Sequence, residues 1–159
     1  MLPALETPLG HSKRIRERML RVDRPVRVVC FGDSVTGVYY HTGSRRAYTA
    51  MLGLALEAAV PGTRVRASNA GISGHTTADG LSRIDKDVLA HKPDIVTVMF
   101  GLNDMVRVSP ADYRKNLITI VGRCRKIGAE VVLATPNNVI DPPRRPTDRL
   151  VENLSHIHK

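Results

Sequence analysis

The sequence contains no tryptophan, only two phenylalanines and four tyrosines, and two cysteines in 159 residues. Two cysteines are too few for a disulfide scaffold. Cys30 and Cys124 each fall within an apolar periodic segment, so we interpret both as reduced, buried, small side chains. No apolar run approaches the about 20 residues that a membrane helix needs, and the N-terminal region lacks the apolar stretch of a secretory signal. We therefore expect a soluble, cytoplasmic protein with no membrane span.

Negative charge is also scarce, with 15 Asp and Glu residues against 24 Lys and Arg and a net charge of +9. The basic residues cluster at 13–21, 45–46, 123–126 and 144–145, and the few aromatic residues are not interleaved with them. A surface that stacks nucleic-acid bases needs such interleaving. The clusters therefore indicate solvated basic helix faces, and we expect no nucleic-acid partner. Affinity for duplex DNA that falls steeply with salt would favour the opposite interpretation.

The chain alternates between two kinds of apolar pattern, and its length suits one domain. Short β-branched runs predict strands at 26–31, 63–68, 95–100 and 131–134. Apolar residues spaced by three and four predict helices at 12–22 and from near 48, 77, 110 and 147. Strands that alternate with helices predict an α/β fold with a parallel sheet covered on both faces. We assign 1–24 to an N-terminal extension with an amphipathic helix and 25–159 to the α/β domain.

Three polar loops follow the first three predicted strands, at the edge of a parallel sheet where sites form. The first begins at Gly32 and includes Gly37, the outer glycine spacing of a phosphate-binding P-loop. However, Val38 and Tyr39 occupy the positions of the P-loop lysine and hydroxyl residue, which argues against nucleotide binding. Ser34 is either a nucleophile at a strand-to-helix turn or, with Asp33, a helix cap. This loop alone does not decide between them.

The second and third loops each admit two interpretations. Gly71 in the second loop either turns the chain or presents a bare backbone N–H to a ligand oxygen. His75 is either a locally bonded loop residue or a catalytic one. In the third loop, Asn103 is either an Asx-turn residue or a neutral donor for a developing oxyanion.

Together, the runs GDSVT, NAGISG and GLND resemble the first three sequence blocks of the SGNH or GDSL hydrolases, over about residues 26–140. The resemblance implies a flavodoxin-like three-layer α/β/α sandwich with strand order 2-1-3-4-5. It also implies hydrolysis of small-molecule carboxylic esters, often acyl esters of sugars and lipids, without a cofactor or metal. Ser34 would be the nucleophile, and Gly71 N–H, the Asn103 amide and the Ser34 N–H would form the oxyanion hole. Asp33 would then serve as a helix cap.

The sequence departs from the family at the last block, because no Asp-x-x-His occurs after Asp104. We therefore expect a fragment of a longer hydrolase, or a degenerate member, that lacks the fifth strand and its base. His156 and His158 lie on the last predicted helix, too far below the cleft to replace that base. Alone, the chain should be a very poor esterase and should self-associate through the exposed edge of its fourth strand. The alternative is a non-catalytic module that binds an ester or a carbohydrate.

Overall fold

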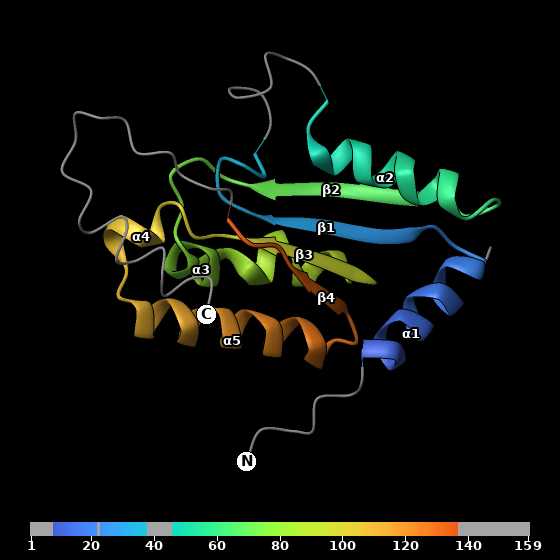
Figure 1. Cartoon of the computed structure of the whole chain (residues 1–159). Coiled ribbons are helices and arrows are strands. Elements are labelled where there is room, and N and C mark those ends of the chain that lie inside the picture. The colour runs from blue at the N-terminus through green and yellow to red at the C-terminus, as the bar shows by residue number, and fades with distance from the viewer. Residues whose placement is uncertain (1–7, 22, 38–45, 137–159) are drawn as a thin grey trace.

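The computed structural model describes residues 8–21, 23–37 and 46–136, with a four-stranded sheet at the centre. The strands are β1 (Val26–Gly32), β2 (Val65–Gly71), β3 (Ile95–Met99) and β4 (Glu130–Leu133). All pairs are parallel, in the order β2-β1-β3-β4 (Figure 1). The helices are α1 (Pro8–Leu20), α2 (Tyr48–Ala59), α3 (Thr77–Asp87), the 3-10 turn η1 (Leu89–His91), α4 (Asp104–Arg107) and α5 (Pro110–Lys126). The predicted α/β class and the order of the first four strands are confirmed.

Each face of the sheet is covered by its own helices, which gives three layers. Residues of β1 alternate between the faces: Val29 and Phe31 pack with α3 and α5, whereas Val28 and Cys30 pack with α1 and α2. In Figure 1, α2 lies on the opposite side of the sheet from α3 and α5. A strand buried on both faces reads as a continuous apolar run, which explains why β1 was predictable.

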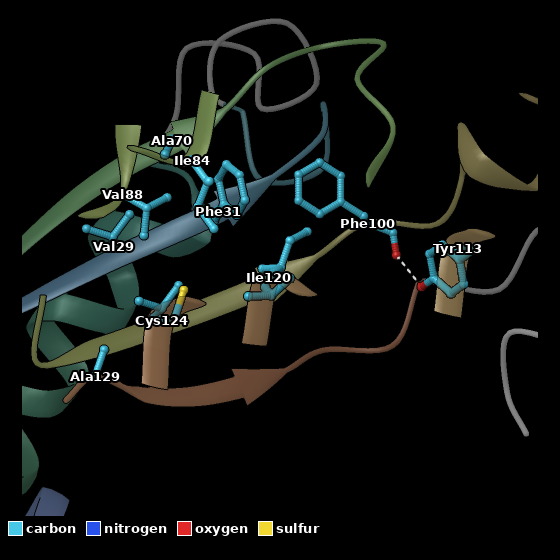
Figure 2. Close-up of a cluster of buried hydrophobic side chains, with 12 residues drawn as sticks. Val29, Phe31, Ala70, Ile84, Val88, Phe100, Tyr113, Ile120, Cys124 and Ala129 are labelled. Carbon is cyan, nitrogen blue, oxygen red and sulfur yellow. Dashed lines mark hydrogen bonds between the residues drawn. The ribbon is translucent and has the colours of Figure 1, made fainter. Parts of the chain in front are cut away.

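The larger core lies between the sheet and the helices α3 and α5 (Figure 2). The Phe31 and Phe100 rings meet edge to face, with centroids 5.1 Å apart. Tyr113 is the polar member of this core, and its hydroxyl donates to the carbonyl of Phe100 at 3.0 Å. Cys124 is fully buried, and burial raises the pKa of its thiol to about 11. Both cysteines are free and buried, as predicted.

Two predicted helix starts are confirmed by their caps. Thr76 and Asp79 form a reciprocal capping box at the start of α3. The Ser109 side chain accepts the backbone N–H of Asp112, with Pro110 as the first residue of α5. Because a capping box joins residues three apart, its sequence signature was sufficient. The helix expected from Thr147 lies outside the described residues.

The predicted second strand, 63–68, was wrong at both ends. β2 runs from Val65 to Gly71, so the first residues of the expected loop belong to the sheet. The reason is pairing: β2 stays in register with β1 up to the pair Gly32 and Gly71, where both strands stop. The short helix α4 directly after Asn103 was not predicted.

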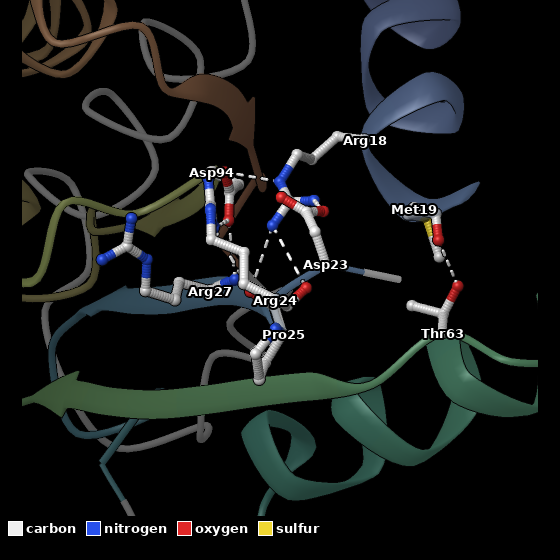
Figure 3. A network of polar contacts seen from close by, with 8 residues as sticks. All are labelled: Arg18, Met19, Asp23, Arg24, Pro25, Arg27, Thr63 and Asp94. Carbon is white, nitrogen blue, oxygen red and sulfur yellow. Dashed lines mark hydrogen bonds and ion pairs between the residues drawn. The ribbon is translucent and has the colours of Figure 1, made fainter. Parts of the chain in front are cut away.

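A cluster of charged side chains fastens α1 to the amino end of the sheet, opposite the loops that follow the strands (Figure 3). Arg24 donates two hydrogen bonds to the carboxylate of Asp94, at 2.7 and 2.8 Å. Arg18 donates a third from α1 at 3.1 Å, and the backbone N–H of Arg27 a fourth at 2.8 Å. The Arg18 side chain is only 15% exposed. The prediction of a solvated basic face is therefore wrong for Arg18, because a buried carboxylate partners it.

No helix in the described ranges is long and apolar enough to cross a membrane.

Candidate functional site

The turn after β1 holds Ser34. The buried carboxylate of Asp33 accepts the backbone N–H of Val35 at 2.9 Å, and the Asp33 carbonyl accepts that of Gly37 at 2.9 Å. These bonds close a tight turn, in which Ser34 is half-buried. In residues 33–37 Asp33 thus caps this turn and not a helix, which corrects the predicted role of this residue.

The end of β2 lies directly against this turn. The Asn69 side chain donates to the carbonyl of Thr36 at 2.7 Å. A Cβ atom on Gly71 would lie 2.2 Å from the nitrogen of Gly37 and 2.8 Å from the carbonyl oxygen of Asp33. Only glycine permits this approach, and its φ is not in the left-handed region. Gly71 therefore lets two backbones pack closely, a role that the sequence did not indicate.

The backbone N–H of Gly71 has a partner within the protein. It donates to the side-chain oxygen of Asn69 at 2.8 Å, while the nitrogen of that same side chain holds Thr36. Asn69 thus ties the end of β2 to the turn of Ser34, and sequence reasoning missed it. Its signal was an asparagine two residues before a glycine, the spacing of an Asx turn. The role of Gly71 N–H as an oxyanion donor stays a prediction.

The third loop places Asn103 just before α4. Its side-chain amide donates one N–H to the carbonyl of His75 at 3.0 Å. An asparagine amide has two N–H groups, so the second can still serve a ligand. Asn103 is therefore fastened to the second loop, and its predicted contact with a developing oxyanion remains a prediction.

Asp104, the residue after Asn103, attaches the third loop to the start of α3. One carboxylate oxygen accepts the backbone N–H of Thr77 at 2.8 Å and the Thr77 hydroxyl at 2.6 Å. The hydroxyl of Thr77 in turn accepts the side-chain amide of Asn116 on α5 at 3.0 Å. Burial raises the pKa of Asp104, and its second oxygen has no hydrogen-bond partner. This carboxylate joins the third loop to α3, which limits the freedom of Asn103 next to it.

His75 is held by a cation. Arg83 on α3 donates from Nε to Nδ1 of His75 at 3.2 Å. A neutral imidazole that accepts at one nitrogen carries its proton on the other, whichever way the ring is oriented. Neither nitrogen then offers a lone pair to the Ser34 hydroxyl. The bond from Arg83 gives the His75 ring a local partner, as the first of its two interpretations expects.

The described side chains thus gather at one edge of the sheet. The turn of Ser34 contacts the end of β2 directly, and Asn103 contacts the second loop through His75. No group of three or more His, Cys, Asp or Glu residues in the described ranges could hold a metal ion. The convergence of Ser34, Gly71 and Asn103 on one ligand stays a prediction.

A family model of the GDSL-like Lipase/Acylhydrolase family matches residues 30–158. The chain belongs to this family. The acetylxylan esterase of Geobacillus stearothermophilus is 29% identical over 155 residues, covering 82% of this chain and 70% of that protein. The esterase TesA of Pseudomonas aeruginosa is 34% identical over 94 residues, covering 58% of this chain and 45% of that protein. The crystal structure of a lipase/acylhydrolase from Enterococcus faecalis has a TM-score of 0.68 and 33% identity, covering 84% of this chain and 69% of that one.

Membership in the GDSL-like family confirms the resemblance drawn from the three loop motifs. The GDSL-like structural relatives also confirm the three-layer architecture. The chain spans only part of each relative described above, less than half in the case of TesA. The esterases among its relatives confirm the predicted class, a carboxylic ester hydrolase by resemblance.

Proposed function

We propose that the chain carries the nucleophile and the oxyanion-binding groups of a serine ester hydrolase. Ser34 attacks the carbonyl carbon of a carboxylic ester and forms an acyl-serine, which water then hydrolyses. The observation that supports this most is the direct packing of the Ser34 turn against Gly71, beside a loop that holds the Asn103 amide. The family and the esterases among its relatives support the same reaction class.

The negative charge that develops on the ester oxygen needs donors aimed at it before the reaction begins. The Asn103 amide has one N–H left for this purpose, and the backbone N–H of Ser34 is a second donor. Gly71 N–H becomes a third donor once the Asn69 oxygen that now accepts it turns away. We propose that substrate binding exchanges this bond for one to the ester oxygen.

The proton of Ser34 needs a base as the ester carbonyl is attacked. His75 does not supply it, because Arg83 occupies one ring nitrogen and the other carries the ring proton. We propose that no other side chain in the described ranges supplies it. Substrate binding and the oxyanion donors then accelerate the reaction alone, a residual of about 10³- to 10⁴-fold over water. We therefore expect slow turnover from these 159 residues by themselves.

The test compares the purified chain with its Ser34→Ala variant. We expect a fluorophosphonate to add to the chain at Ser34, as located by peptide mass, and not to the variant. Hydrolysis of p-nitrophenyl acetate should depend on Ser34 and stay below ~1 per second, the low end of ordinary enzymes. No labelling, with equal hydrolysis by both proteins, would instead favour a module that binds esters without cleaving them. Turnover above that limit would reveal a base not identified above.

The outer edge of β4 is the surface through which we propose that the chain self-associates. Val132 and Leu133 are 46% and 55% exposed, and no strand in the described ranges pairs with the outer edge of β4. We expect the sedimentation coefficient to rise with protein concentration, and Val132→Lys to reduce that rise because charge opposes edge pairing. A monomer at high concentration would contradict this.

The cytoplasmic location and the lack of a nucleic-acid partner stay predictions.

A further inference from the structure

One arginine on α3, Arg83, contacts the end of β1, the end of β2 and the loop after β2. Nη2 of Arg83 donates to the carbonyl of Gly32 at 2.9 Å, and Nη1 donates to the carbonyl of Ala70 at 2.8 Å. Nε donates to Nδ1 of His75 at 3.2 Å. The side chain is only 10% exposed, so these bonds form in a largely dry setting.

The two carbonyls mark the ends of neighbouring strands. Gly32 is the last residue of β1 and lies two positions before Ser34. Ala70 lies one position before Gly71, which ends β2. The pairing of β1 with β2 stops at these residues. Past them, the backbone N–H of Asp33 donates to the carbonyl of Met99 at 3.4 Å, and that of Ile72 donates to the carbonyl of Gly32 at 3.1 Å. Arg83 bridges the two strands at this point.

The third contact extends the same hold to Asn103. The ring of His75 accepts a hydrogen bond from Arg83, and its backbone carbonyl accepts one from the side-chain amide of Asn103. His75 therefore connects the guanidinium of Arg83 to the side-chain amide of Asn103.

Two further contacts fix the plane of the guanidinium. Nη1 also donates to Asp87, one turn further along α3, at 3.0 Å. The central carbon of Arg83 lies 4.7 Å from the centre of the Phe31 ring. A planar, five-donor fork suits this set of partners, whereas a lysine ammonium is a single point of charge.

We propose that Arg83 is a positioning residue for ester hydrolysis, an inference that rests on the proposed function. It touches no substrate. It holds the ends of β1 and β2 and the His75 loop in one arrangement, so that Ser34, Gly71 and Asn103 face the same ester carbonyl. Loss of this hold displaces the groups relative to one another, and a displacement of about 1 Å lowers a rate by on the order of 10²-fold.

The experiment compares Arg83→Met and Arg83→Lys with two matched controls. Asp87→Asn removes only the ion pair along α3. Arg123→Met removes a half-buried arginine of α5 that pairs with the exposed Asp85 of α3. Amide NMR spectra report on Gly71 and on the Asn103 side chain, and imidazole ¹⁵N shifts report the tautomer of His75. Steady-state kinetics with p-nitrophenyl acetate separate kcat from KM.

We expect Arg83→Met to move the Gly71 and Asn103 amide signals and to replace one His75 tautomer with a mixture. Its Ser34-dependent kcat should fall on the order of 10²-fold while KM changes less than about twofold. Arg83→Lys should restore little of this. Asp87→Asn should lower kcat much less than Arg83→Met, because Arg83 keeps its bonds to Gly32, Ala70 and His75. Arg123→Met should match the unaltered chain.

Unmoved Gly71 and Asn103 signals in Arg83→Met would overturn the inference, as would an unchanged kcat. A loss of kcat in Asp87→Asn equal to that in Arg83→Met would also overturn it, because the ion pair alone would then account for the effect. If the chain shows no Ser34-dependent turnover, the proposed function fails, and the NMR signals still decide the role of Arg83.

Discussion

Replacing Gly71 with alanine should reduce labelling of Ser34 by a fluorophosphonate on the order of 10²-fold or more. The added Cβ would lie 2.2 Å from the nitrogen of Gly37, 2.6 Å from the carbonyl carbon of Thr36 and 2.8 Å from the oxygen of Asp33. All three are backbone atoms, so no side-chain rotation relieves the overlap. The turn that carries Ser34 must move by about 1 Å, the scale at which reacting groups lose their alignment.

The same substitution should lower the free energy of unfolding by about 1–3 kcal/mol, the usual effect of overpacking. Gly122→Ala is the matched control, because nothing lies within 4 Å of its Cβ position and its φ is ordinary. Gly122 lies inside α5, so alanine there should raise stability by about 0.5–1 kcal/mol and leave labelling unchanged. Intact-protein mass spectrometry over time gives the labelling rate. Labelling of Gly71→Ala at the unaltered rate would show that the turn tolerates the displacement.

Replacing Asp94 with alanine should destabilise the fold by about 2–3 kcal/mol, below the scale for a fully buried ion pair because the Arg24 side chain is 41% exposed. The carboxylate is 12% exposed and accepts hydrogen bonds from Arg18, Arg24 and the backbone N–H of Arg27. Alanine at position 94 leaves those donors without the carboxylate that accepts their hydrogen bonds. Urea unfolding measures the loss. Asp85→Asn is the control: that aspartate is 74% exposed, so its ion pair contributes at most about 1 kcal/mol.

Asp94 also makes stability depend on pH. Burial raises its pKa, but the hydrogen bonds from Arg24 and the Arg27 amide, with the charge of Arg24, outweigh burial and lower the pKa to about 2. An acid whose pKa is depressed on folding stabilises the fold above its ordinary pKa, here 3.8. That contribution, about 2 kcal/mol, is lost as the pH falls from near 5 to 2. Asp94→Asn should lack this part of the acid sensitivity; an equal decline in both proteins would contradict the assignment.

Features set by residues close in sequence were predictable. The caps at Thr76 and Ser109 each depend on a partner three residues further along the chain, and β1 is a continuous apolar run in the sequence. The end of β2 depends instead on its register with β1, which no local pattern contains. The predicted end fell short of Gly71 for that reason.

The contacts around the site join residues even further apart in the sequence, so local patterns predicted them even less well. Arg83 has partners 8, 13 and 51 residues away, and its sequence context is that of any arginine on an amphipathic helix. Gly71 was singled out for its N–H, yet its lack of a Cβ is what the structure uses most visibly. The loop motifs identified the family, whereas the contacts between these loops could be found only from the fold.

The strand order has a consequence for synthesis of the chain. Among the described strands, β1 leaves the ribosome before the other three, yet both of its hydrogen-bonding edges belong to strands made later, β2 and β3. Until β3 emerges, a strand destined for burial on both faces has at least one open edge. Nascent chains therefore pass through a window in which β1 can pair with a neighbouring polypeptide. Slower growth at lower temperature, or a co-expressed chaperone, should raise the yield of folded protein by shielding this strand.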